Sequence, residues 1–498
     1  MSLVELAKSA GKRKKVFAPR SRTGCRSCRI RHIRCDESPG QCRNCTSAGW
    51  ECEGYDVHRL PWGHLTRTGS GVQVAIAMTP DERHSFSYFQ HRSIVHLTGL
   101  FDSPLWQQHV LQMCHADPAV FHAVNMLGAA HQECELNNMQ LVDAAVQSHQ
   151  VYRFALQQSA RAMRLLNQRL SSRSNDPALI QVVLLCCLLF VMTDVLLGRY
   201  ENAWTHLQCG MDILEDEKTP PVEPSLVAVF GRLDSQAALY GRSQKVLRIL
   251  QLPQFQEPPP LQPFTTFNQL QSAVSSILAT GNRLVATCLN LPESSYLIHY
   301  AQLSLAQARL LSRITQFHVH FNRFATLYPA TLTEKQRHGL DLLRILTMGH
   351  GLVIKISLMP DPLPASLLPE FLAVLEAHEA YIARDAHYHH RRPTLTTDHG
   401  IIANAFTLAT RAPDIPTRLR GLAVLRAWPH YEGLHNSAVA TLLATNALKR
   451  HLRENGMEPG PALRTTKQDD AFIGQFLRRV RSGAGKKHVV PLIMAGIC

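Results

Sequence analysis

The sequence predicts a mostly α-helical chain that begins with a small cysteine-rich module. Six cysteines recur at a regular spacing near the N-terminus, and apolar residues recur at helical spacing through most of the remaining chain. The chain has 498 residues and a hydrophobic content of 45%, which is enough for a sizeable core and for more than one domain. We therefore expect a small N-terminal module followed by a large all-α region.

The six cysteines form two copies of the pattern C-x2-C-x6-C, offset by 17 positions. Each C-x2-C pair places two sulfurs on one side of a helical turn, and the later cysteine folds back to supply a third. Because tetrahedral zinc takes four ligands, six thiolates satisfy two zinc ions only if two sulfurs are shared. The predicted ligands of two zinc ions are Cys25, Cys28, Cys35, Cys42, Cys45 and Cys52.

Two other arrangements of these cysteines stay open: three disulfides, or one four-cysteine zinc site with two spectators. Disulfides are typical of small secreted domains. The stretch MSLVELAKSAGKRKK at the start of the sequence has no apolar signal-peptide core, so we expect a reducing compartment. The regular spacing therefore favours zinc.

The two halves of the cysteine repeat differ in charge. Basic side chains crowd the first half, whereas the residues between Cys45 and Cys52 include none. Arginine has a planar fork that matches phosphate oxygens and the guanine edge, although the same arginines could simply neutralise a metal centre of net charge −2. The residues expected to contact DNA are Arg26, Arg29, Arg31, His32 and Arg34.

The stretch from Thr23 to Cys52 resembles the Zn2Cys6 binuclear zinc cluster of fungal transcription factors. The resemblance implies that the first and fourth cysteines, Cys25 and Cys42, bridge the two metals. Each remaining pair would then complete one zinc site, and these pairs are Cys28 with Cys35 and Cys45 with Cys52.

The resemblance also implies that a CGG-like triplet in double-stranded DNA is contacted by the segment holding Arg31 and His32. Lysine or arginine is common in this family at the place of His32. A neutral imidazole donates only one hydrogen bond, so we expect an altered or relaxed base preference.

The N-terminal region is strongly basic. Residues 1–60 contain 13 Lys and Arg against six Asp and Glu, so their net charge is 13 − 6 = +7. This is half of the formal net charge of the chain, which is +14. Such a region favours phosphate backbones. Residues 1–22 are expected to be disordered, and the basic run Lys12, Arg13, Lys14 and Lys15 predicts nuclear localisation, with a solvated tail as the alternative.

No heptad repeat follows the cysteine module. Pro61, Gly63 and Gly69 interrupt any helix there. A dimer would therefore form through the helical region, or the protein would bind a single DNA half-site as a monomer.

Three later segments resemble the fungal-specific regulatory domain that accompanies these clusters, namely Pro118 to His131, Ala203 to Leu214 and Thr397 to Ser437. Asp117-Pro118 is typical of a helix start. In the third segment Asp398 and Gly400 match an aspartate-glycine helix start, which indicates capping and packing rather than catalysis.

The apolar run Ala178 to Met192 has 15 residues, fewer than the ~20 that a bilayer requires, so it predicts a buried core helix. A later helix is expected to carry an apolar stripe formed by Leu303, Ala306, Leu310 and Ile314. The remaining cysteines are predicted to be buried free thiols, and they are Cys114, Cys134, Cys186, Cys187, Cys209, Cys288 and Cys498.

The sequence motifs of several common enzyme classes are incomplete or absent in this chain. The stretch Gly483 to Lys487 lacks the first glycine and the serine or threonine of a phosphate loop, and HExxH, GxSxG and GxGxxG are absent from the sequence. The histidines of HYHHRR, His387 to Arg392, have no second ligand group nearby and indicate an exposed loop. We therefore expect no enzyme.

The predicted domains are a basic tail, a Zn2Cys6 DNA-binding domain, a linker, two halves of a helical regulatory region with a proline-rich connection between them, and a C-terminal segment. Their ranges are 1–22, 23–54, 55–83, 84–252, 253–266, 267–460 and 461–498.

The function predicted from the sequence is zinc-dependent, sequence-specific DNA binding in the nucleus. It would regulate transcription by RNA polymerase II through the transcription machinery, with metabolic or secondary-metabolite genes as the targets that the resemblance implies. Two alternatives stay open. The cluster could be a protein-binding adaptor, or the helical region could be an enzyme or a small-molecule sensor.

Overall fold

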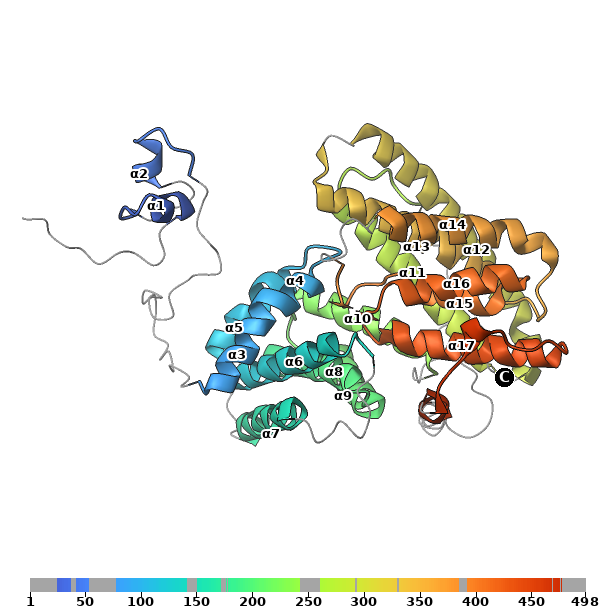
Figure 1. The fold of residues 1–498 in the computed structure, drawn as a ribbon, viewed down its shortest axis with the longest axis horizontal. Helices are drawn as coiled ribbons and strands as arrows, with labels where there is room; N and C mark the ends of the chain where they lie inside the picture. The colour runs from blue at the N-terminus through green and yellow to red at the C-terminus, as the bar shows by residue number, and fades with distance from the viewer. Residues whose placement is uncertain are drawn as a thin grey trace, which may run out of the picture. The chain divides into compact units, whose positions relative to one another are not determined.

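The computed structural model divides into two compact units, Met1–Ala75 and Ile76–Cys498 (Figure 1). The structure describes residues 25–36, 42–52, 78–140, 150–171, 176, 178–241, 260–291, 293–328, 331–384, 392–467, 469–474 and 476. Several predictions fall outside these residues. They concern the basic run, most of the linker, most of the proline-rich connection, His387 to His390 and Cys498.

The first unit contains two short helices, α1 (Arg26–Ile30) and α2 (Arg43–Thr46). Each begins directly after the first cysteine of one C-x2-C-x6-C repeat. Cys42 is the N-cap of α2, and its sulfur accepts a hydrogen bond from the backbone N–H of Cys45 at 3.3 Å. Among the described residues of this unit, the buried side chains are the six cysteines and Ser27. Sulfur atoms therefore form the interior of this part of the protein.

The second unit is a helical bundle whose earlier half includes two short π-helical stretches, η2 and η3. Asp117 caps α6 by accepting from the N–H of Ala119 at 2.8 Å, and Pro118 is its first residue, as predicted. The elements of this half are α3 (Pro80–Tyr88), η2 (Phe89–Ser93), α4 (Ile94–Leu97), η3 (Leu105–His109), α5 (Val110–Ala116), α6 (Pro118–Leu136), α7 (Gln150–Ser171), α8 (Leu179–Leu196), α9 (Tyr200–Glu215) and α10 (Pro224–Leu239).

The later half adds longer helices and a small sheet. Its elements are α11 (Phe267–Asn290), α12 (Glu293–Leu327), α13 (Glu334–Ile356), η8 (Ala365–Leu367), α14 (Leu368–Arg384), β1 (Leu395–Thr396), α15 (Ile402–Arg411), α16 (Ile415–Ala427), β2 (Tyr431–Glu432), β3 (His435–Asn436), α17 (Ser437–Glu454) and η10 (Pro461–Leu463). β2 pairs in parallel with β1 and antiparallel with β3. The mostly α fold class is confirmed.

One apolar core runs through both halves of the helical unit, from Phe86 to Phe476. The stripe predicted on α12 is buried, with Leu303 fully enclosed. α8 is long and apolar enough to cross a membrane by composition alone, but 78% of it is buried between its neighbours in the bundle. Figure 1 shows α8 beside α6 and α9, as expected for a core helix.

The aspartate-glycine segment does not cap a helix in the predicted way. α15 begins at Ile402, and its first N–H donates to the carboxylate of Glu432, 3.1 Å away at Oε2. Asp398 instead lies 3.5 Å from Arg232 Nη2. A cap supplied from 30 residues further along depends on tertiary packing, which local sequence does not reveal.

One cysteine prediction is wrong. Cys209 is exposed, whereas the other five cysteines described in the helical unit are buried. Cys209 lies on α9 between Leu207 and Gly210, which both face the core. The helical rotation therefore turns its side chain outward.

Candidate metal centre and nucleic-acid interface

The six cluster cysteines converge as two overlapping groups of four sulfurs. One group is Cys25, Cys28, Cys35 and Cys42, and the other is Cys25, Cys42, Cys45 and Cys52. All sulfurs within a group lie within 4.8 Å of one another. Cys25 and Cys42 therefore belong to both groups.

The sulfur spacing fits tetrahedral zinc. Zn–S bonds of about 2.3 Å place neighbouring sulfurs of a tetrahedron about 3.8 Å apart. In the first group the Sγ atoms of Cys28 and Cys42 lie 3.5 Å apart, and in the second group those of Cys25 and Cys45 lie 3.7 Å apart. Six sulfurs at such spacing, with two common to both groups, suit a binuclear centre.

The backbone supports the sulfurs in a repeated pattern. The N–H of Cys25 points at Sγ of Cys35, and the N–H of Cys42 points at Sγ of Cys52, both at 3.4 Å. The N–H of Cys28 points likewise at Sγ of Cys25, and Cys45 with Cys42 forms the matching pair. The sequence repeat is thus a structural repeat, and N–H donors reduce the cost of concentrating thiolate charge.

Polar contacts join the two halves around the sulfurs. The carboxylate of Asp36 accepts from the backbone N–H groups of Arg43 and Asn44 at 3.1 and 3.2 Å, at the start of α2. Asn44 Nδ2 donates to the carbonyl of Arg34 at 2.7 Å. Asp36 therefore caps the second half from the end of the first.

The thiols are strongly desolvated. Burial raises the pKa of the Cys25 thiol to about 12, and it also raises the pKa of the Cys28 and Cys42 thiols. Without a cation, these groups therefore hold their protons at neutral pH. A bound dication stabilises the thiolate form, so metal binding would displace the protons.

The expected DNA-contacting residues lie on and after α1. Arg31 is half-buried, while His32 and Arg34 are exposed. His32 has a φ of 54°, which reverses the chain at the end of α1. Arg26 and Arg29 are residues of α1, and the structure describes their backbone but not their side chains.

The sequence did not predict the contact between Arg31 and Trp50. The guanidinium carbon of Arg31 lies 4.7 Å from the centre of the Trp50 ring. Trp50 remains 56% exposed. The signal in the sequence was an aromatic residue in the repeat half that has no basic residue between Cys45 and Cys52. Trp50 and Arg31 are 19 positions apart, and no local periodicity predicts that residues at this separation come into contact.

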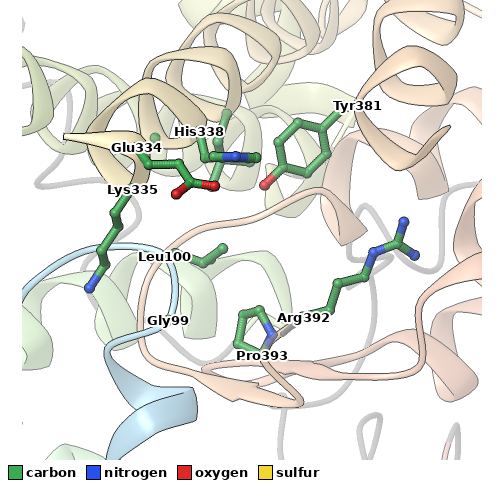
Figure 2. A pocket seen from close by; sticks show the side chains of 10 residues that line it. Gly99, Leu100, Glu334, Lys335, His338, Tyr381, Arg392 and Pro393 are labelled. Carbon is green, nitrogen blue, oxygen red and sulfur yellow. The ribbon is translucent and has the colours of Figure 1, made fainter. Parts of the chain in front are cut away.

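The helical unit holds a cavity of about 230 Å³ between α13, α14 and the segments around Gly99 and Pro393. Figure 2 shows the carboxylate of Glu334, the imidazole of His338 and the hydroxyl of Tyr381 directed toward the same part of it. Leu100 and Leu342 supply apolar wall.

Two basic side chains at this cavity are engaged by other parts of the protein. Lys335 Nζ lies 2.5 Å from the carbonyl of Thr98 and 2.7 Å from Asp102 Oδ1. Arg392 donates to the carbonyls of Ile382 and Ala427.

Two protein-family models match parts of the chain. Residues 23–60 match the fungal Zn(2)-Cys(6) binuclear cluster domain, and residues 84–247 match the fungal specific transcription factor domain. The cluster domain is a zinc-binding domain, which agrees with the cysteine groups. No solved structure matches the chain.

Similar curated proteins are fungal regulators. The aspercryptin biosynthesis cluster-specific transcription regulator of Emericella nidulans is 28% identical over 39% of this chain and 35% of its own length. The transcription regulator lscL of Purpureocillium lilacinum is 26% identical over 39% and 49%. A transcriptional regulatory protein of Schizosaccharomyces pombe is 56% identical over 7% of each chain. The chain thus spans half or less of the length of these relatives.

Proposed function

We propose that this chain, which carries the cluster domain and the regulatory domain of fungal Zn(2)-Cys(6) transcription regulators, binds double-stranded DNA in the nucleus and regulates transcription. Two zinc ions would be held by the six cluster cysteines, with Cys25 and Cys42 bridging. Arg26, Arg29, Arg31, His32 and Arg34 would form the DNA-contacting set, directed at a CGG-like triplet. The chain would act through the transcription machinery rather than as an enzyme.

One observation supports the proposal. The first group of four sulfurs, whose spacing suits a zinc ion, holds a short basic segment in place. Arg34 and His32 are exposed next to Cys35, which belongs to the first sulfur group. A segment fixed in this way can hold cationic side chains against phosphates and base edges without a large domain behind it.

The test is selection of preferred sites by the full chain from a random duplex pool, followed by titration of the selected duplex at several salt concentrations. We expect an enriched triplet and a decrease of log K with log salt, since each phosphate contact adds nearly one unit to the slope. The number of triplets in the selected site reports whether a homodimer or a monomer binds.

Two exposed arginines offer a matched comparison. Arg34→Ala removes a cation from the half expected to contact DNA, and Arg43→Ala removes one from the other half. We expect the first change to weaken binding and to reduce the salt slope by about one unit, and the second to have little effect. Equal effects, or salt-insensitive binding to protein alone, would favour the adaptor function.

Nuclear localisation rests on the basic run. Replacing Lys12, Arg13, Lys14 and Lys15 with alanine should shift a fluorescently tagged full chain from the nucleus to the cytoplasm. Unchanged nuclear retention would assign import to another segment.

A second candidate function, small-molecule sensing, is favoured by the cavity shown in Figure 2. Its apolar wall would contact the body of a ligand. Lys335 is hydrogen-bonded to Asp102 and Thr98, and Arg392 donates to two backbone carbonyls. The carboxylate of Glu334 is an ionic group that points into the cavity. A compact apolar molecule with an amine donor would suit this combination better than an anion.

Benzylamine, benzyl alcohol and benzoate are suitable probes, and binding to the full chain can be measured by calorimetry. We expect benzylamine to bind most tightly, Glu334→Gln to remove that preference, and Leu100→Trp to block all three. Tighter binding of benzoate, or no change with Leu100→Trp, would rule out this site and its ligand class.

A further inference from the structure

We infer that Trp50, from the uncharged half of the cluster, positions the guanidinium of Arg31 for DNA and thereby acts as a specificity-determining residue. The inference rests on the proposed DNA binding. It extends the DNA-binding surface to the half of the repeat that has no basic residue between Cys45 and Cys52.

The geometry is that of a cation stacked on an indole face. Arg31 Cζ lies 4.7 Å from the ring centre of Trp50, well within the ~6 Å over which such pairs attract. Arg31 Nη1 is shielded from solvent and meets no hydrogen-bond acceptor among the described residues. The indole face is therefore the contact that the structure gives for the guanidinium group of Arg31.

Both partners are held by backbone contacts on their own side. The N–H of Arg31 donates to the carbonyl of Ser27 at 3.1 Å, and the N–H of Trp50 donates to the carbonyl of Cys45 at 2.9 Å. The hydroxyl of Ser27 also donates to the carbonyl of Glu51 at 2.9 Å. The last contact ties α1 directly to the residue that follows Trp50.

This arrangement matters because of the residue next to Arg31. His32 donates at most one hydrogen bond when neutral, so it cannot form the bidentate contact by which a guanidinium recognises guanine. A long arginine side chain loses much rotamer freedom when it binds. Stacking on Trp50 limits that freedom in advance, and it leaves the edge of the guanidinium for a base.

The test uses the full chain and the duplex selected above. Trp50→Leu keeps apolar bulk and removes the aromatic face, whereas Trp50→Phe keeps a face. We expect Trp50→Leu to weaken binding about two- to fivefold and to broaden the base preference, with Trp50→Phe close to the original protein. Zinc content, measured by mass spectrometry, should be the same in all three.

A double-mutant cycle separates positioning from a general structural role. In the Arg31→Ala background, Trp50→Leu should cause no further loss, because there is no guanidinium left to position. An additive loss, or equal binding by Trp50→Leu and the original protein, would overturn the inference. Failure of the original protein to prefer any duplex would instead overturn the proposed function, so the two failures are distinguishable.

Discussion

Cysteine has opposite roles in the two units. In the described residues of the first unit, the buried apolar cluster consists of six cysteines. In the helical unit, Cys114, Cys134 and Cys186 are minor members of a core built from aromatic and aliphatic residues. The first unit therefore depends on what its sulfurs bind, whereas the second depends on the apolar area that it buries.

Zinc removal should give the largest difference between the units. A strong chelator should abolish DNA binding by the full chain, because the buried cluster in the described part of the first unit consists of the metal-binding cysteines themselves. The thermal unfolding transition of the helical unit, followed by circular dichroism, should stay in place. A parallel loss of both signals would show that the units do not fold separately.

Single cysteine changes refine this prediction. Cys42→Ser removes a sulfur that belongs to both groups, whereas Cys52→Ser removes one that belongs to a single group. We expect Cys42→Ser to lose both zinc ions and Cys52→Ser to retain more zinc, as measured by native mass spectrometry.

The second-largest effect should be a loss of stability of the helical unit at acidic pH. Burial lowers the pKa of His96 to about 4 and that of His131 to about 3, and the same cause lowers the pKa of His350 and His435 to about 4. These side chains are neutral when folded, and in the unfolded chain they take up protons below about pH 6.5. Their contribution to stability is therefore complete above that pH and is lost as pH falls toward 4.

Contacts around His96 show why the proton is excluded. Its Nδ1 accepts from the backbone N–H of Thr394 at 2.8 Å, so protonation there would break a buried hydrogen bond. Each such histidine should cost about 2 kcal/mol of stability at pH 5. Urea unfolding at pH 7.5 and pH 5 should show the decrease, and His131→Gln should reduce it whereas the exposed His84→Gln should not.

A single buried carboxylate should have a smaller but clear effect. Glu432 lies 2.6 Å from His430 Nε2 and also accepts from the N–H of Ile402. Glu432→Ala would leave the N–H of Ile402 and Nε2 of His430 buried without this partner, so we expect a loss of about 3–5 kcal/mol in the free energy of unfolding. Glu370→Ala, which breaks an exposed pair with Lys355, should cost less than about 1 kcal/mol.

Features set by short-range spacing could be predicted from the sequence. The two cysteine repeats hold six thiols in all, and two tetrahedral zinc ions would have to share two of them, because each ion takes four ligands. The two overlapping sulfur groups agree with this expectation. Asp117-Pro118 marked the start of α6, since capping involves only neighbouring residues. The stripe from Leu303 to Ile314 on α12 followed from helical periodicity alone.

Features set by long-range packing could not be predicted. Thr394 meets His96 across 298 positions, and Glu432 caps a helix that begins 30 residues earlier. The stacking of Arg31 on Trp50 depends on how the sulfurs bring the two halves together. In each case the sequence supplies suitable partners without the register that would select one pairing.

Thiol labelling should show the smallest effects and test the cysteine comparison directly. With zinc bound, Cys209 should react fastest among the described cysteines, because it is the exposed one. Burial raises the pKa of the Cys134, Cys187 and Cys288 thiols to about 12, so they should stay protected in the folded chain. Chelation should expose the cluster cysteines and leave those three unreactive. Cys209→Ser should remove the fast phase with a change in stability below about 0.5 kcal/mol, and a larger change would show that Cys209 packs against the core.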